Sequence, residues 1–313
     1  MDPAPDHRTR KLRNQADVIA GVGFFADEIQ RAYAALGFHD PGFVRNGLRM
    51  FNWQPYFLAR SAPMGTVSGE VVAATFGVFP LHRVLANVAD GLQLADYPTM
   101  LATRLEATTA AMTRILGAEP DGAPRATELL RRGVDHADVS GRALYAGLRS
   151  LPYPGTTVGD LWHACTLYRE HRNDVHISAW TTAGLSGAQA CLLNDLRQNL
   201  GFKTFVRTRG WSEEELADAV AGLERRGLIE GEAMTPAGHE LREWIEAATD
   251  AQQTPIVDAI GPDLDELLAI LDPMRRAILA DGAYPSSNYV HTTAKDRGAG
   301  GTAGTALGDD VRG

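Results

Sequence analysis

Hydrophobic positions recur at helical spacing along most of the chain. The first such stripe runs from Val18 to Leu36 in steps of three and four residues, and Gly37 follows it as a C-cap. The same pattern predicts further helices over residues 66–90, 97–117, 124–149, 157–171, 186–200, 212–227, 236–253 and 263–280. Two short glycine-flanked stretches, 203–209 and 229–234, alternate with period two and are expected to form small strands. The pattern therefore predicts a mainly α fold with a small β-wing.

Cap residues mark where several of these helices begin. Ser186 precedes Gln189 by three positions and Ser212 precedes Glu215 by three, so each pair fits a capping box. Thr235 followed by Pro236 fits the N-cap and first position of another helix. These helix starts are therefore predicted by two independent signals, the cap and the hydrophobic stripe.

The boundaries divide the chain into four expected segments. We expect a flexible basic tail over 1–14 and a helical N-terminal domain over 15–184. A winged-helix-like domain with long C-terminal helices is expected over 185–282, and a disordered tail over 283–313. The last segment is rich in Gly, Thr, Ala and Asp and has no hydrophobic stripe to bury.

Composition excludes several classes of protein. The chain has 313 residues, 44% of them hydrophobic, and a formal net charge of −9, which excludes a wholly disordered chain. No apolar run approaches the roughly 20 residues that span a bilayer, and the polar N-terminus lacks the apolar stretch of a signal peptide, so we expect a cytoplasmic protein without a membrane partner. Cys165 and Cys191 fall in helical patterns and are expected to be reduced core thiols.

The stretch from Gly210 to Gly238 has a recognisable form. It contains a helical run ending in Leu-Glu-Arg-Arg-Gly-Leu (Leu223 to Leu228), a short wing, and a Thr-x-x-Gly turn that starts at Thr235. This stretch resembles the second half of a MarR-like winged helix-turn-helix. The resemblance implies a recognition helix before the wing and a long helix after it that serves in dimerisation, so a homodimer is one expected state.

Charge argues against DNA contact through this element. Between Ser212 and Asp272 there are 16 acidic residues and three basic ones, a local formal charge of −13. Affinity for DNA comes mainly from Lys and Arg that neutralise phosphates, and a recognition helix presents its N-terminal residues to the bases, where this chain has Glu213, Glu214 and Glu215. The basic residues of the N-terminal tail remain as an alternative contact. DNA is thus an open but disfavoured partner.

A second resemblance covers about residues 15–280. The block from Leu161 to His176 is similar to that of a large actinobacterial family of helix-turn-helix proteins of unknown function, and Arg-Glu-His-Arg (169–172) is its most specific part. The same family carries further segments that match this chain at Tyr56, Phe57, Arg60, Ala62, Pro63 and Gly65, at Val72, Ala74, Thr75 and Phe76, and at Arg209 to Ser212. The resemblance implies a fold and a lineage, and little chemistry.

The 169–176 block also supplies the candidate chemistry. The first helix of this region is expected to end near His171 or Arg172, and Asp174 is expected to cap a second helix from Val175, so that Glu170, His171 and His176 meet at a corner. One interpretation is structural, with caps and buried hydrogen bonds. A second makes His171 and His176 the acid or base, with Glu170 and Asp174 orienting them. A metal site from these four residues is a third, but their spacing matches no zinc or iron motif, so we expect none.

A weak internal repeat suggests where a ligand would bind. Aligning Arg60 with Arg169 makes the halves similar, which predicts a pseudo-two-fold arrangement with a shared cleft. The expected ligand-binding residues at this cleft are Arg60, Tyr56, Phe57, Trp162, Thr166 and Arg169.

The sequence therefore favours a cytoplasmic protein that binds a small molecule and has a degenerate winged helix, with or without enzymatic activity on an anionic organic substrate. The alternative is a MarR-like ligand-responsive DNA-binding transcriptional regulator, and a protein-interaction scaffold is a third class. No cofactor is identifiable from the sequence.

Overall fold

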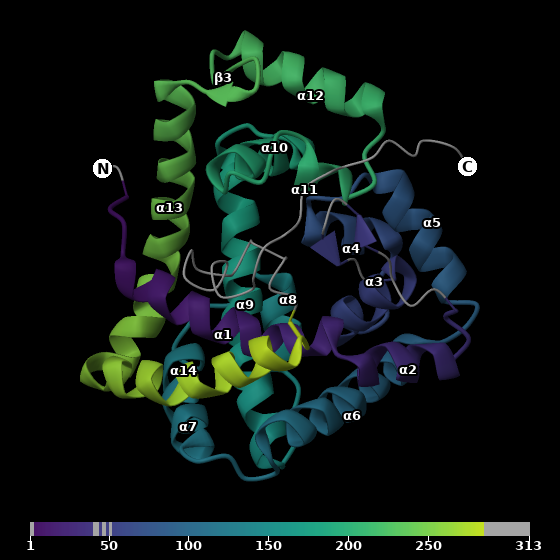
Figure 1. Ribbon diagram of the computed structural model, residues 1–313, viewed down its shortest axis with the longest axis vertical. Helices are drawn as coiled ribbons and strands as arrows, with labels where there is room; N and C mark the ends of the chain where they lie inside the picture. The colour runs from purple at the N-terminus through teal and green to yellow at the C-terminus, as the bar shows by residue number, and fades with distance from the viewer. Residues whose placement is uncertain (1–2, 40–43, 46–47, 50–51, 285–313) are drawn as a thin grey trace.

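The computed structural model describes residues 3–39, 44–45, 48–49 and 52–284 of the chain, and the expected disordered tail lies outside them from residue 285 onward. The described part is mainly α-helical, with two short antiparallel hairpins (Figure 1). Its α-helices are α1 (His7–Phe25), α2 (Asp27–Ala35), α3 (Trp53–Ser61), α4 (Gly69–Phe76), α5 (Leu81–Gly91), α6 (Tyr97–Leu116), α7 (Ala123–Val134), α8 (Ala143–Arg149), α9 (Thr157–Thr182), α10 (Gly187–Arg197), α11 (Thr204–Arg207), α12 (Glu213–Arg225), α13 (Pro236–Ile260) and α14 (Leu264–Asp281). The strands are β1 (Val44–Arg45), β2 (Leu48–Arg49), β3 (Ile229–Glu230) and β4 (Ala233–Met234), and two 3-10 turns span Ala62–Met64 and Gly261–Asp263.

Helix α9 forms the axis of the molecule. It packs against α1, α7 and α13, and α1 in turn packs against α14, so that α1 and α14 cross α9 at mid-height (Figure 1). Two hydrophobic cores lie along this axis. The larger one gathers residues from α1 to α9 together with α14 and the second half of α13, whereas the smaller one joins the end of α9 to α10, α12, the β3–β4 hairpin and the first half of α13.

The N-terminal segment is helical, so the expected flexible tail over 1–14 is wrong from His7 onward. Asp6 caps α1 by accepting a hydrogen bond from the backbone N–H of Arg8, and Leu12 is buried in the larger core. The Arg10 guanidinium lies 2.6 Å from the Asp250 carboxylate of α13. The basic residues that looked like a free arm at the sequence level thus include one that anchors α1 to α13.

Three expected helices are each divided in two by the structure. The first stripe, from Val18 to Leu36, covers the end of α1 and all of α2, which are separated at Ala26. The stripe over 66–90 forms α4 and α5, because Gly77 takes a positive φ of 61° at the C-cap of α4 and Pro80 precedes α5. The stripe over 124–149 forms α7 and α8, which are separated by residues 135–142. Hydrophobic spacing alone does not reveal such breaks, because the stripe continues on both sides of them.

For helix α9 the expectation failed in the opposite way, because two helices were expected and one is present. It continues without interruption to Thr182, so the expected corner near His171 and the expected helix start at Val175 are wrong. No glycine or proline occurs between Asp160 and Ala183, and the polar side chains of Asn173 and Asp174 have tertiary partners instead of capping α9. Glu170 and Asp174 therefore lie one turn apart on the same helix.

The segment from α10 to α13 follows the expected order. The capping boxes at Ser186 and Ser212 and the N-cap at Thr235 are confirmed, and β3 pairs with β4 at Ile229 and Met234. The strand expected over 203–209 is wrong. Thr204–Arg207 forms α11, whose first-turn N–H groups at Phe205 and Val206 donate to the buried Asp195 carboxylate.

Among the described residues, no helix combines the length and the apolar character needed to cross a membrane.

Candidate functional site

Four of the residues expected to matter for chemistry lie together. Arg60 in the last turn of α3 reaches Glu170 on α9 through two hydrogen bonds, from Nε to Oε1 at 3.1 Å and from Nη2 to Oε2 at 2.6 Å. Arg60 also donates through Nη1 to the Tyr56 hydroxyl at 2.6 Å, and Arg169 donates to the same Glu170 carboxylate. Glu170 is 1% exposed and Arg60 is 5% exposed, so this is a buried charge cluster between α3 and α9.

The electrostatics of the cluster keep Glu170 ionised. Burial favours a raised pKa for this carboxyl, but the guanidiniums of Arg60 and Arg169 outweigh it and hold the pKa of Glu170 below its usual value. Buried ion pairs of this kind depend on each partner, because removal of one leaves the other charged and desolvated. Glu170 therefore neutralises arginines and is not poised to exchange protons near neutral pH.

A third guanidinium, that of Arg104 on α6, lies at the same junction and forms no hydrogen bond with a carboxylate of the described residues. Arg104 is 3% exposed, and its Nε and Nη1 make long hydrogen bonds to the carbonyl oxygens of Gly23 (3.3 Å) and Ala59 (3.4 Å). Within the described residues its Nη2 has no hydrogen-bond partner. The guanidinium carbon lies 4.5 Å from the centre of the Phe24 ring and 5.2 Å from that of Trp162. Burial lowers the pKa of Arg104; Tyr33 and Glu170 act against this effect, and the nearby arginines add to it.

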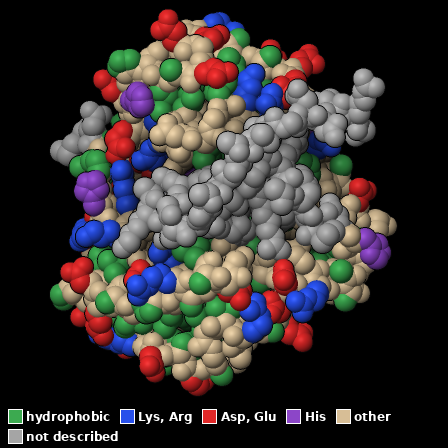
Figure 2. Space-filling model, viewed as in Figure 1, with side chains coloured by type: hydrophobic (Ala, Val, Ile, Leu, Met, Phe, Trp, Pro, Cys, Tyr) green, Lys and Arg blue, Asp and Glu red, His purple; other side chains and the backbone are tan. Residues whose placement is uncertain are grey.

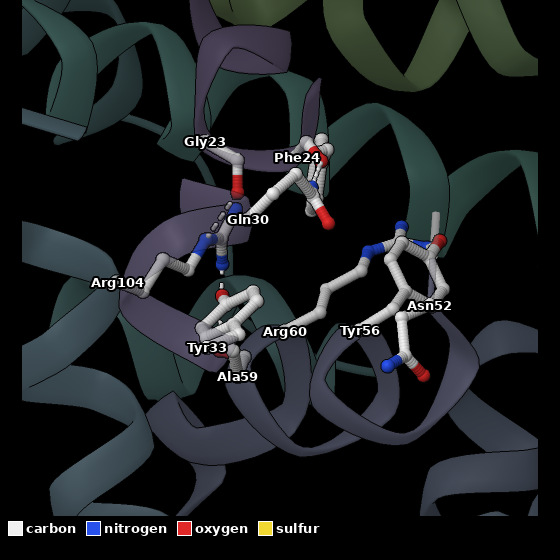
Figure 3. Close-up of a pocket in the computed structure, with 9 residues that line it drawn as sticks. All are labelled: Gly23, Phe24, Gln30, Tyr33, Asn52, Tyr56, Ala59, Arg60 and Arg104. Carbon is white, nitrogen blue, oxygen red and sulfur yellow. Dashed lines mark hydrogen bonds between the residues drawn. The ribbon is translucent and has the colours of Figure 1, made fainter. Parts of the chain in front are cut away.

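A narrow pocket opens beside Arg104. The space enclosed between its side chains is about 10 Å³, roughly the room of one water molecule, and it reaches about 240 Å³ only when the open solvent at its mouth is included. Figure 3 shows Arg104 on one side, held between the Gly23 and Ala59 carbonyls, and Tyr56 and Arg60 on the opposite side. The lining comes from α1, α2, α3, α6 and the residue before α3, and comprises Gly23, Phe24, Gln30, Tyr33, Asn52, Tyr56, Ala59, Arg60 and Arg104.

The polar lining of the pocket is partly committed to the fold. Asn52 is the N-cap of α3 and accepts a hydrogen bond from the backbone N–H of Gln54. The Gln30 amide donates to the carbonyl of Phe24 at the end of α1. Burial raises the pKa of Tyr33 to about 12, so its hydroxyl keeps its proton at neutral pH. The pocket thus combines aromatic walls with neutral donors and two arginines.

The two histidines of the block lie elsewhere. His171 packs edge to face against Tyr145 of α8, with 5.0 Å between ring centres, and within the described residues its Nδ1 has no hydrogen-bond partner. His176 pairs through Nδ1 with the Thr249 hydroxyl of α13 at 3.0 Å. Burial lowers the pKa of each imidazole to about 3, so both are neutral at pH 7. Neither forms a hydrogen bond with Glu170 or Asp174 in the described part of the chain.

Asp174 has a structural role. Its Oδ2 accepts a hydrogen bond from the backbone N–H of Tyr145 in the first turn of α8, at 3.0 Å. Burial raises the pKa of Asp174 to about 6. The carboxylate thus supplies from α9 the cap that α8 lacks in its own sequence, where Arg142 stands at the N-cap and makes no capping hydrogen bond with its side chain.

The remaining expected ligand-binding residues serve packing. Phe57 is fully buried, with its ring centre 4.9 Å from that of Phe79. Trp162 donates from its indole nitrogen to the Ala20 carbonyl, and Thr166 donates to the Trp162 carbonyl one turn earlier in α9. Of the six residues expected at the cleft, Tyr56 and Arg60 line the pocket.

Sequence reasoning missed Arg104, Tyr33 and Asn52. A signal for Arg104 does exist, because the buried positions of α6 include Tyr97, Met100, Arg104, Ala107 and Ala111 at helical spacing. An arginine in such a stripe is a charge placed on an apolar face, which needs either a partner or a function. Asn52 and Tyr33 carry no comparable signal.

A second buried network ties α9 to α13. Arg172 bonds Glu246 at 2.7 Å and Asp250 at 3.3 Å, and Arg242 bonds Glu246 at 2.6 Å. These side chains are each less than 10% exposed. Arg172 of the Arg-Glu-His-Arg block is therefore part of the joint between the two cores.

The outer surface of α12 and the β3–β4 hairpin is acidic. Glu213, Glu214, Asp218 and Glu224 of α12 are exposed, as are Glu230 and Glu232 of the hairpin. Figure 2 shows carboxylates gathered at the top of the molecule, where these elements lie in Figure 1. The basic residues nearby are largely engaged: Arg226 donates to the carbonyls of Gly184 and Ala183, and Arg207 pairs with Glu213.

No group of three or more His, Cys, Asp or Glu side chains in the described residues is arranged to hold a metal ion. In comparisons with known proteins, a model described as a helix-turn-helix family matches residues 9–285 of the chain. No curated protein and no solved structure matches it.

Proposed function

The chain belongs to this helix-turn-helix family, and from that premise we propose that it binds a small organic molecule in the pocket between α1, α2, α3 and α6. The observation that carries the proposal is the pocket itself, where aromatic rings form the walls and a few polar groups converge. Small-molecule sites have this composition, with polar groups that orient a ligand held mainly by apolar contact. The proposal is for binding without turnover, because neither candidate imidazole lines the pocket: His171 is buried against Tyr145, and the half-buried His176 bonds Thr249.

The acidic surface supports a role for α12 other than DNA binding. A recognition helix contacts bases with its N-terminal residues, and here Glu213 and Glu214 are exposed at that end. Of the three basic residues between Ser212 and Asp272, Arg242 is buried against Glu246 and Arg226 bonds carbonyl oxygens. The third, Arg225, is exposed and forms no such ion pair or hydrogen bond with the described residues.

A second candidate is a ligand-responsive, DNA-binding regulator of the MarR-like kind. The family match favours it, and bears on it more directly than on ligand binding. The order of α10, α11, α12, the β3–β4 hairpin and α13 also fits a winged helix followed by a long helix. On this candidate a second copy of the chain would supply the other recognition helix of a dimer.

Two measurements on the full-length protein test the proposal. Native mass spectrometry of freshly purified protein is expected to show a small additional mass that denaturation releases. Fluorescence anisotropy with fragments of the gene's own upstream DNA is expected to show weak binding with little dependence on salt between 50 and 200 mM. Six to ten phosphate contacts would instead weaken binding about 10³- to 10⁵-fold over this range.

A charge variant makes the DNA test specific to α12. Replacing Glu214→Gln together with Asp218→Asn removes two exposed charges from α12, and Glu106→Gln on the exposed side of α6 is the control. A steep salt dependence together with tighter DNA binding in the α12 variant alone would favour the regulator. Affinity that is equally weak in all three proteins supports the proposal.

A further inference from the structure

The buried arginines between α3, α6 and α9 outnumber the carboxylate that they share. Glu170 receives two hydrogen bonds from Arg60 and one from Arg169, and none from Arg104. The Arg169 side chain is 19% exposed and retains contact with water, whereas Arg104 is 3% exposed. Arg104 is therefore the desolvated cation at this junction that forms no hydrogen bond with a carboxylate of the described residues, although Glu170 attracts it at longer range.

The lengths of the hydrogen bonds that Arg104 makes also indicate that it lacks a close anionic partner. Charged N–H groups make short hydrogen bonds of about 2.7–2.9 Å to oxygen anions, but the two that Arg104 makes to carbonyls are 3.3 and 3.4 Å long. Its Nη2 makes none within the described residues, although the side chain lines the pocket. Buried charges are normally paired, because an isolated ion in a protein interior is costly.

We propose that the pocket takes a small organic carboxylate, with the Arg104 guanidinium as its counter-ion. This inference rests on the proposed function and names the chemical class of the ligand. One guanidinium without a hydrogen-bonded carboxylate matches a monoanion, and its planar N–H fork matches the planar carboxylate group. The aromatic rings of Phe24 and Tyr56 line the same pocket and offer apolar contact to the rest of the molecule.

Matched pairs of small probe molecules separate the effect of the ligand's charge from that of its shape. Benzoate and acetate carry the carboxylate, and benzamide and acetamide are their neutral counterparts of nearly the same size. Isothermal titration of the full-length protein at pH 7 is expected to show binding of a carboxylate and at least tenfold weaker binding of the corresponding amide. A charge-assisted hydrogen bond contributes enough for a difference of about 10- to 100-fold.

Three variants locate the binding. Arg104→Met removes the charge at similar length. Asn52→Asp places a carboxylate in the lining and preserves the N-cap of α3, and Asn52→Ser preserves the same cap without charge. We expect Arg104→Met and Asn52→Asp each to weaken benzoate or acetate binding at least tenfold, and Asn52→Ser to retain it within about threefold. If Arg104→Met does not fold, the comparison of Asn52→Asp with Asn52→Ser decides.

The outcomes distinguish this inference from the function on which it rests. Amides that bind as well as the carboxylates, with affinities that Asn52→Asp leaves unchanged, would overturn the carboxylate class but preserve a ligand pocket. Carboxylate binding that survives both Arg104→Met and Asn52→Asp would place the anion elsewhere and also overturn it. If no probe binds at millimolar concentration and the purified protein carries no small molecule, the proposed function fails as well.

Discussion

Replacing Glu170→Gln tests whether the buried charge cluster joins α9 to the N-terminal helices. The substitution keeps the shape of the side chain but removes the charge that neutralises Arg60 and Arg169. Removing one partner of a buried ion pair leaves the other desolvated, at a cost of about 3–5 kcal/mol. Domains are typically stable by about 5–15 kcal/mol, so the expected loss is a large fraction of the total.

The chain provides a matched control at the surface. Glu213 and Arg207 also form a two-pronged pair, with both N–O distances at 3.0 Å, but their side chains are 67% and 39% exposed. Exposed pairs contribute about 0.2–1 kcal/mol, so Glu213→Gln is expected to change the free energy of unfolding by no more than this. The two variants remove the same chemical group and differ mainly in burial.

Urea unfolding at pH 7, followed by both circular dichroism and tryptophan fluorescence, measures the difference. Coincident transitions by the two signals would justify a two-state free energy for a molecule with two cores. The pKa of Glu170 is lowered in the folded state, so its stabilisation is present at neutral pH and disappears as pH falls below the usual glutamate range. The difference in free energy of unfolding between the wild type and Glu170→Gln should therefore become smaller in acid. A Glu170→Gln loss as small as that of Glu213→Gln would refute the reasoning.

Three further changes test other parts of the structure. His171→Phe removes an imidazole whose pKa falls to about 3 on folding. In the wild type this imidazole gains a proton below about pH 6.5 in the unfolded chain but not in the folded one, so the free energy of unfolding decreases as pH falls. The free energy of unfolding of the variant should therefore depend less steeply on pH between 6 and 4, by about 1.4 kcal/mol per unit. Asp174→Ala removes the cap of α8 and should cost about 1 kcal/mol in urea unfolding, whereas Asp138→Ala, in an exposed turn, should cost less. Gly187→Ala would place a methyl group against the carbonyl oxygen of Gly77 and should lower stability by about 1–3 kcal/mol; an unchanged urea midpoint would contradict this close approach of α10 to the end of α4.

Local signals were sufficient for much of the fold. The helical stripes predicted a mainly α protein, and the caps at Ser186, Ser212 and Thr235 marked the starts of α10, α12 and α13, because a side chain and the N–H it satisfies are three residues apart. The β3–β4 hairpin followed in the same way from the period-two alternation over the glycine-flanked stretch 229–234. Each of these features depends on neighbours in sequence.

The candidate site was only partly accessible from the sequence. Arg60, Tyr56, Glu170 and Arg169 were identified as candidates, but the hydrogen bonds that bring them together, from Arg60 to Glu170, join α3 to α9 across more than 100 residues. The expected corner at His171 failed because Asp174, which has the sequence signature of a cap, caps α8 and not its own helix. Side-chain type shows that a polar group needs a partner, but not which helix provides it.

The sequence by itself determined the helical class, most helix starts and the acidic character of the α12 region, since these follow from local spacing and summed charge. The tertiary structure alone decided which charges are neutralised. It buried Glu170 among arginines, tied Arg172 to α13 and placed Arg104 beside a pocket with no hydrogen bond to a carboxylate of the described residues. The physical reason is that desolvation and pairing depend on distances between helices that are remote in sequence, and the pattern of residues along one helix does not contain those distances.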